Sequence, residues 1–283
     1  MIYVSTGGKS SQTAYETACE FLKFDIKNIE LSGGIYDKKA DDNIKLLANH
    51  SNIQLHNYFP PPAKPFVMNL ASNNVNIVET TKNHIKRALN LSAEIGTFLY
   101  SFHAGFLLDP KVEELGNRVE KKPLINRDKA MSRFIENVNE LALFAEELGA
   151  TLLIENNVLS YSNYHYFNEN PFLMVNAEEC IKVMNETPDN VLLLVDVAHL
   201  KVSSNSLGFN KIQFLELVNS FIGAYHLSDN DGLSYSNEEV RKDSWFWPYI
   251  NADKNYYSLE VYRKNPQFLL NQVSLAKRML NLN

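Results

Sequence analysis

The sequence lacks several features that would point to particular classes of protein. It contains only two cysteines, Cys19 and Cys180, which lie far apart in the chain. A disulfide-stabilised secreted scaffold is therefore excluded, and we expect both thiols to be buried as small apolar side chains in a reducing compartment. No stretch is apolar enough to span a membrane, and Met1 leads directly into a predicted strand without a signal peptide. We expect a soluble cytoplasmic protein with no membrane partner.

Clusters of basic residues are also missing. The chain has 27 Lys and Arg against 33 Asp and Glu, a formal net charge of −6, and its basic side chains are scattered along helical segments. Because nucleic-acid binding depends on clustered Lys and Arg, we expect no nucleic-acid partner. No glycine-rich dinucleotide motif follows the first predicted strand, and Thr6-Gly7-Gly8-Lys9-Ser10 lacks the spacing of a phosphate-binding loop.

Short apolar and β-branched segments alternate with segments of helical period. The predicted strands are Ile2–Ser5, Asn28–Leu31, Ile53–His56, Thr97–His103, Thr151–Glu155, Val191–Asp196, Ile222–Leu227 and Tyr257–Val261. The clearest helices are predicted over Ser10–Phe24, Val75–Ile95, Arg127–Leu148 and Asn176–Glu186, with a last one opening at Asn265-Pro266. Eight strand–helix repeats predict an α/β fold, a (β/α)8 TIM barrel that forms one domain over residues 1–283. An open, doubly wound sheet is the structural alternative.

The longest irregular segments are residues 60–74, 105–126, 157–175 and 229–254. All four follow predicted strands, which is where barrel enzymes carry their active-site loops. The placement of the long loops after strands, and not before them, supports the barrel independently of any motif.

Potential metal ligands occupy the last or the last-but-one position of the last four predicted strands. They are Glu155, Asp196, His226 and Glu260. Because the C-terminal ends of barrel strands converge on one mouth, we expect these side chains to meet there. Unpaired carboxylates beside buried strands are costly, so three carboxylates and an imidazole predict one shared divalent metal ion. Without a cysteine ligand the set suits Mn²⁺, Mg²⁺, Co²⁺ or Zn²⁺.

Three further histidines occupy similar places. His56 and His103 end the third and fourth predicted strands, and His199 follows Asp196. A single histidine at a strand end is usually structural, but beside three carboxylates these three predict substrate-binding groups. Glu30, at the end of the second strand, is open to two interpretations: pairing with a histidine or contact with the substrate.

These segments together resemble the sugar-phosphate isomerase and epimerase group of xylose isomerase-like barrels, over essentially the whole chain. The segments that carry the resemblance are Ile29-Glu30-Leu31, His56, Phe102-His103-Ala104-Gly105, Leu153-Ile154-Glu155-Asn156, Asp196-Val197-Ala198-His199, His226-Leu227-Ser228-Asp229 and Leu259-Glu260. In the ketose 3-epimerases of that group, the residues matching Glu155, Asp196, His226 and Glu260 hold one divalent cation. The residue matching His199 helps to hold the substrate.

The chain departs from those epimerases at two positions. Tyr161 stands where they carry a second glutamate, and Gly232 stands where they carry an arginine. The loop that follows also differs, with Ser244-Trp245-Phe246-Trp247-Pro248-Tyr249 in place of a glycine-rich segment. These departures bear on the substrate more than on the chemistry.

The chemistry expected of this set is proton transfer at a carbon next to a sugar carbonyl, through an enediolate. Two carboxylates on opposite faces of the substrate can remove and return the proton, and Glu155 and Glu260 are the expected catalytic pair. A divalent cation polarises the carbonyl and stabilises the enediolate. A hydride shift between two carbons is left open. The expected partner is a small-molecule carbohydrate.

Two other functions are also compatible with the sequence. The histidines and carboxylates also resemble much of the trinuclear zinc set of endonuclease IV, a phosphodiesterase, but no histidine follows His226. The second alternative function is a barrel that binds a sugar without catalysis.

The aromatic residues of two loops are either platforms for a sugar ring or packing residues, including contacts in a homo-oligomer. They are Tyr161, Tyr164, Tyr166, Phe167, Trp245, Phe246, Trp247 and Tyr249.

Overall fold

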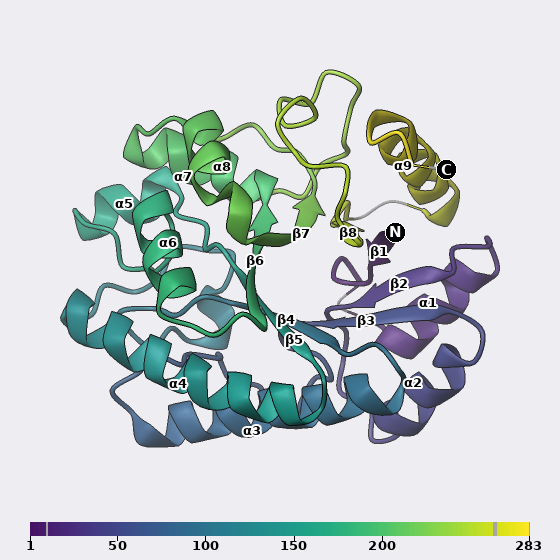
Figure 1. The fold of residues 1–283 in the computed structure, drawn as a ribbon, viewed down its shortest axis with the longest axis horizontal. Helices are drawn as coiled ribbons and strands as arrows, with labels where there is room; N and C mark the ends of the chain where they lie inside the picture. The colour runs from purple at the N-terminus through teal and green to yellow at the C-terminus, as the bar shows by residue number, and fades with distance from the viewer. Residues whose placement is uncertain (10, 263–264, 283) are drawn as a thin grey trace.

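The computed structural model describes residues 1–9, 11–262 and 265–282, which form a closed barrel of parallel strands. The strands pair in chain order, and β8 closes the ring against β1 (Figure 1). They are β1 (Ile2–Ser5), β2 (Asn28–Leu31), β3 (Asn52–His56), β4 (Leu99–His103), β5 (Thr151–Glu155), β6 (Val191–Asp196), β7 (Ile222–Leu227) and β8 (Tyr256–Leu259). The predicted (β/α)8 barrel is confirmed, and the open-sheet alternative is wrong.

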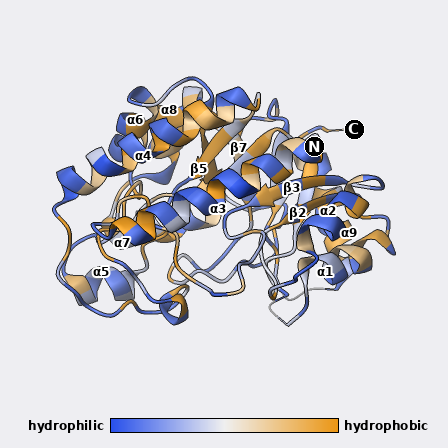
Figure 2. Ribbon diagram, turned by 90° about the horizontal axis from the view of Figure 1, so that it is seen from below, coloured by the Kyte–Doolittle hydropathy of each residue, from blue (hydrophilic) through white to orange (hydrophobic). Residues whose placement is uncertain are grey.

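Helices surround the strand ring (Figure 1). They are α1 (Ala14–Leu22), α2 (Ala40–Ala48), α3 (Val75–Glu94), α4 (Arg127–Glu147), α5 (Tyr161–Phe167), α6 (Ala177–Asn185), α7 (Val197–Leu207), α8 (Lys211–Val218) and α9 (Pro266–Met279), with short 3₁₀ turns at Val112–Glu114 and Asn219–Phe221. Hydrophobic and hydrophilic residues alternate around α3 and α4 (Figure 2), because each buries one face against the barrel. No helix of the described residues is long and apolar enough to cross a membrane.

The strand boundaries agree closely with the prediction, with two informative differences. β4 begins at Leu99 rather than Thr97, because Phe98 has a φ of 52°, in the left-handed region that a strand does not use. β8 ends at Leu259 rather than Val261. Glu260 therefore lies just past the last strand, and its N–H still donates to the carbonyl of Leu227 in β7 at 3.1 Å.

The helix predictions held for α3, α4, α6 and α9 to within one or two residues at the ends. α1 begins at Ala14, where Thr13 and Glu16 form a capping box; the predicted start at Ser10 lies outside the described residues. The sequence pattern does not predict α2, α7 or α8, and α5 lies inside the segment 157–175 that is predicted to be irregular. The start of α7 is hard to predict from the sequence because Val197 follows directly after the last residue of β6, with no connecting loop.

Strand parity places the candidate ligands inside the barrel. A buried interior cluster contains Leu153, Leu194, Ala224 and Tyr256, together with Tyr3. Side chains two residues apart on a strand point to the same face. Glu155, Asp196 and His226 each follow a member of this cluster by two positions, and Glu260 follows Tyr256 by four. All four therefore project into the barrel at the C-terminal end of the strands.

Candidate metal and substrate site

Glu155, Asp196, His226 and Glu260 meet at the mouth of the barrel. Each offers one ligand atom, and these four atoms lie within 4.8 Å of one another. None of the four residues is more than 2% exposed. The structure thus brings together the residues that the sequence predicted as one metal site, although they come from four separate strands.

The lone pairs of this group lack partners. Both carboxylate oxygens of Glu155, Oδ2 of Asp196 and Nδ1 of His226 are buried and have no hydrogen-bond partner among the described residues. A buried polar atom without a partner typically costs about 1–3 kcal/mol, and more if charged. Four such atoms converging on one point fit a bound divalent cation, since a cation would satisfy them all. The residues present therefore fit the metal that the sequence predicted.

Asp196 is held by the junction between β6 and α7. Its Oδ1 accepts hydrogen bonds from the N–H groups of Ala198 and His199, both at 2.7 Å, and so caps α7. Its own N–H donates to Oδ1 of Asn156 at 2.8 Å. One oxygen is thus committed to the helix, and the other, Oδ2, is left for a ligand.

Glu155 lies among four imidazoles. Nε2 of His56 and Nδ1 of His103 lie 3.3 and 3.5 Å from its Oε2. Nδ1 of His199 and Nδ1 of His226 lie 3.3 and 3.5 Å from its Oε1. Burial raises the pKa of Glu155 to about 8, although the neighbouring His226 acts to lower it. Burial likewise raises the pKa of Asp196 to about 6 and that of Glu260 to about 7. Three buried carboxyl groups this close together are stable as anions only with added positive charge.

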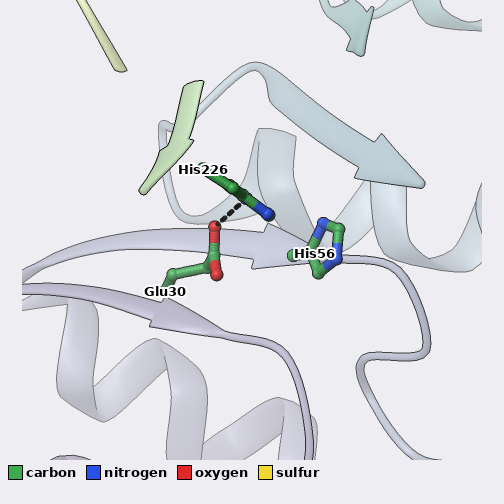
Figure 3. A group of neighbouring side chains, drawn as sticks. All are labelled: Glu30, His56 and His226. Carbon is green, nitrogen blue, oxygen red and sulfur yellow. Dashed lines mark hydrogen bonds and ion pairs between the residues drawn. The ribbon is translucent and has the colours of Figure 1, made fainter. Parts of the chain in front are cut away.

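The orientation of His226 is set by a further buried carboxylate, that of Glu30, which contacts the ring nitrogen remote from the ligand group. Nε2 of His226 lies 2.9 Å from Oε2 of Glu30 (Figure 3). The same oxygen of Glu30 also accepts a hydrogen bond from the Tyr256 hydroxyl. Burial alone would raise the pKa of Glu30, but the charge and hydrogen bond of His226 outweigh it and lower that pKa to about 2. Glu30 therefore pairs with a histidine, the first of the two interpretations that the sequence left open. With Nε2 taken, Nδ1 of His226 faces the ligand group.

Glu260 differs from Glu155 in being firmly hydrogen-bonded. The Tyr262 hydroxyl donates to its Oε1 at 3.0 Å, and the Tyr235 hydroxyl donates to its Oε2 at 3.2 Å. Nδ2 of Asn237 also donates to Oε2, at 3.4 Å. Tyr262 in turn lies directly against Gly7, where any side chain would overlap its ring. The orientation of Glu260 is therefore set by groups from two loops.

The three histidines predicted to bind substrate occupy different places. His103 and His199 both line a cavity of about 410 Å³ that opens beside the ligand group, and Nε2 of His199 is buried without a partner. His56 is 3% exposed and lies against the ring of His226 (Figure 3). Its Nδ1 lies 2.8 Å from Oγ of Ser101. Burial lowers the pKa of all three below its usual range, to about 3 for His199.

The aromatic loops mostly serve packing. Phe246 and Trp247 are buried in the main core, and the Trp247 indole N–H donates to the carbonyl of Arg241 at 2.6 Å. Tyr161 is 60% exposed and stacks on His165. The aromatic rings beside the ligand group are instead those of Tyr235, Tyr256 and Tyr262, which sequence reasoning missed. Alternation offered a signal for two of them, because Tyr256 and Tyr262 share the parity of Glu260.

Basic residues near the mouth are already engaged. Nζ of Lys201 lies 2.6 Å from Oδ1 of Asp229, and Arg241 pairs with Glu239 at 3.5 Å. Arg263, which the sequence also places near the mouth, lies outside the described residues. Within the described ranges, these contacts leave no cluster of free cations beside the ligand group that would hold a phosphate.

Comparisons with known proteins agree with this fold. The model of a family described as xylose isomerase-like TIM barrel matches residues 19–248. A comparison with curated protein sequences found no match. Three solved structures resemble the chain closely in fold. A D-tagatose 3-epimerase-like protein has a TM-score of 0.68 at 15% identity, covering 99% of this chain and 97% of that one.

A putative xylose isomerase from Rhodospirillum rubrum has a TM-score of 0.69 at 14% identity, with 100% of this chain and 99% of that chain covered. The 3-keto-D-glucoside 4-epimerase from E. coli, in its apo form, has a TM-score of 0.66 at 11% identity, with 98% of each chain covered. At such identities the likeness shows the fold alone. Together with the family match over most of the sequence, it establishes that the chain belongs to the xylose isomerase-like TIM barrels.

Proposed function

We propose that this protein is a divalent-metal-dependent sugar isomerase or epimerase that moves a proton at a carbon next to a carbonyl. The observation that carries the proposal is the convergence of four buried candidate ligands beside a cavity lined by two histidines. Glu155, Asp196 and His226 each bring a ligand atom that has no hydrogen-bond partner among the described residues. The structural similarity to a 3-keto-D-glucoside 4-epimerase and to a D-tagatose 3-epimerase-like protein supports it at the level of fold. The substrate is a small carbohydrate.

The cation would be held by Glu155, Asp196, His226 and Glu260, and would supply Lewis-acid polarisation of the sugar carbonyl. Glu155 and Glu260 then exchange protons with the substrate carbon from its two faces, through an enediolate. His199, with its free Nε2, and His103, at the cavity wall, bind substrate hydroxyls. His56 acts from behind, by packing against His226 and Glu155.

The two carboxylates have unequal roles in this proposal. Glu260 accepts three hydrogen bonds, from Tyr235, Tyr262 and Asn237, which keep it fixed. Glu155 accepts none from the described residues, and burial raises its pKa to about 8. Because no hydrogen bond from the described residues fixes its oxygens, Glu155 is the freer of the two to take up the proton, and Glu260 serves as its partner on the opposite face.

One observation favours a second candidate, a metal-dependent phosphodiesterase. His56, His103 and Glu155 form another group whose ligand atoms lie within 4.8 Å of one another, so a second cation has ligands available. Against it, the residues after β7 are committed to loop structure: Oδ1 of Asp229 accepts from Lys201 and Oδ2 from Ser244, at 2.6 and 2.8 Å. With a net charge of −6 as well, the isomerase proposal is better supported.

Exchange of carbon-bound hydrogen with solvent tests the proposal directly. The purified protein, loaded with Mn²⁺, is incubated in heavy water with a panel of ketoses, ketose phosphates and inososes, and deuterium at carbons next to the carbonyl is followed by NMR. We expect exchange with at least one of them, and none after treatment with EDTA or in Asp196→Asn. Metal-dependent cleavage of a phosphodiester, without any exchange, would favour the rival. A protein that binds sugars but neither exchanges nor isomerises them is a binding module.

A further inference from the structure

The cavity beside the ligand group is larger than one sugar ring requires. Its volume is about 410 Å³, within the range of roughly 300–1,000 Å³ that typically holds drug-sized ligands. At one end are His103, His199 and Tyr235, the last of which also contacts Glu260. Residues of the loops that follow β4, β5 and β7 also line the cavity.

Solvent-exposed side chains that line the cavity include Leu115, Arg118, Ser162 and Leu233, and we call the part of the cavity that they line the outer compartment. All four are exposed to solvent; Leu115 and Leu233 are 48% and 64% exposed. Two exposed leucines on different loops that face one cavity offer an apolar surface for a ligand. Ser162 and Arg118 add polar groups beside it.

Arg118 does not make the outer compartment a phosphate site. Its guanidinium lies 4.7 Å from the centre of the Tyr166 ring, and it forms no ion pair among the described residues. Among the described residues, it is the one Lys or Arg side chain that lines the cavity, and Glu114 lines the same cavity. The side chain of Glu114 accepts hydrogen bonds from the N–H groups of Lys111 and Glu120, which hold this carboxyl group at the wall of the cavity. A phosphate would normally be held by several cationic groups or by an array of backbone N–H groups.

We infer that the substrate is a sugar with a second, glycosidically linked ring, which occupies the outer compartment while the reacting sugar lies at the ligand group. This rests on the proposed function and specifies its substrate class. Sugar rings present C–H faces to apolar side chains and hydroxyls to groups such as Ser162 and Arg118. The reacting carbonyl must remain free, so the second ring is attached through an oxygen other than that of the carbonyl carbon.

A matched series of ketoses tests this inference. Fructose, fructose 6-phosphate and isomaltulose differ only at one oxygen, which carries hydrogen, phosphate or a glucosyl ring. Solvent exchange at the carbons next to the carbonyl is measured for each with the Mn²⁺-loaded protein, together with kcat/KM. We expect isomaltulose to exceed the other two by about tenfold or more, the ratio given by roughly 1.4 kcal/mol of added contact.

Filling the outer compartment provides the matching variant. Leu233→Trp should lower the ratio of kcat/KM for isomaltulose to that for fructose by about tenfold. Leu217→Trp, at an exposed leucine of α8, is the control and should leave the ratio unchanged. Equal kcat/KM for all three ketoses, or a preference for the phosphate, overturns the inference while leaving the proposed function intact.

If no ketose exchanges, the proposed function fails, and calorimetric titration of the Mn²⁺-loaded protein still decides the inference. Tighter binding of isomaltulose than of fructose, lost in Leu233→Trp, supports the outer compartment as a sugar-binding site. Equal binding of the two sugars, or binding of neither, overturns it.

Discussion

Glu30 of β2 accepts a hydrogen bond from Nε2 of His226 in β7 at 2.9 Å, although 196 positions separate the two residues in the sequence. This contact turns Nδ1 of His226 toward Glu155 and Glu260, at 3.5 and 3.7 Å. A carboxylate behind a metal-binding imidazole sets its tautomer and makes it a better ligand. Glu30 is therefore part of the candidate site, although no ligand would touch it.

Replacing Glu30 by Gln should weaken the binding of Mn²⁺ by about 10–100-fold, the usual effect of losing such a partner. Glutamine retains an oxygen that can accept from His226 but lacks the charge that stabilises the imidazole. The measurement is the dissociation constant for Mn²⁺, by calorimetry. Glu94→Gln, at an exposed surface ion pair with Lys45, is the control. Unchanged affinity in Glu30→Gln would show that Glu30 only fills space.

Replacing Asp196 by Asn should abolish most of the metal binding without unfolding the protein. An asparagine can still accept the hydrogen bonds from Ala198 and His199 that cap α7, but it brings no charge to the ligand group. We expect metal content near zero after dialysis, and a melting temperature that no longer falls on addition of EDTA. Asp128→Asn, in the first turn of α4, is the matched control. Normal metal content in Asp196→Asn would contradict the site.

Glu155→Gln and Glu260→Gln should each reduce kcat by about 10²–10⁴-fold, the range usual for a general acid or base. Deuterium incorporation from solvent should fall in parallel, because both residues exchange protons with the same carbon. Glu216→Gln, on the exposed face of α8, serves as control. Turnover that persists in Glu155→Gln without solvent exchange would indicate a hydride shift in place of proton transfer.

Gly7→Ala should impair activity through Tyr262. A Cβ at position 7 would lie 2.7 Å from Cζ of Tyr262 and still closer to its hydroxyl, so the ring must move. That hydroxyl holds Oε1 of Glu260 at 3.0 Å, and displacing a reacting group by about 1 Å can lower kcat by about 100-fold. Gly33→Ala, whose Cβ would meet Gly7 Cα at an ordinary 3.4 Å, should have little effect. The measurement is kcat alongside the melting temperature. Equal loss in both variants would point to general destabilisation.

His84 should make the protein less stable in acid. It is buried against Tyr58 and Phe66, and burial lowers its pKa to about 4 from an ordinary value of 6.5. The folded protein thus binds fewer protons here than the unfolded chain, so the contribution is fully present above pH 6.5 and is lost as the pH falls toward 4. The loss is about 3 kcal/mol, since each pKa unit corresponds to about 1.4 kcal/mol.

Urea unfolding at pH 7 and pH 4.5 measures this contribution. We expect His84→Gln to lose less stability between the two pH values than the parent does, whatever its stability at pH 7. His50→Gln, at an exposed histidine, should behave like the parent. The same loss in all three proteins would assign the acid sensitivity to other buried groups.

Much of the barrel could be predicted from the local pattern of apolar and polar residues in the sequence. Parallel strands buried on both faces are short apolar runs, and the strand ends at His56, His103, Glu155, Asp196 and Leu227 agree with the structure. The convergence of the four candidate ligands was predictable for the same reason, since residues at the C-terminal ends of barrel strands gather at one mouth and those with interior parity point into it. α5 was missed because its seven residues, rich in aromatic side chains, show too few turns for a helical period.

The sequence by itself determined the order of the strands, the parity that turns four side chains inward, and the residue types available to a cation. These properties depend on neighbours along the chain, where a period of two decides which face a side chain takes. Only the tertiary structure decided that Glu30 supports His226, that tyrosines from two segments fix Glu260, and that three loops enclose one cavity. Those contacts join residues remote in sequence, and their geometry depends on how the barrel closes and how its loops pack.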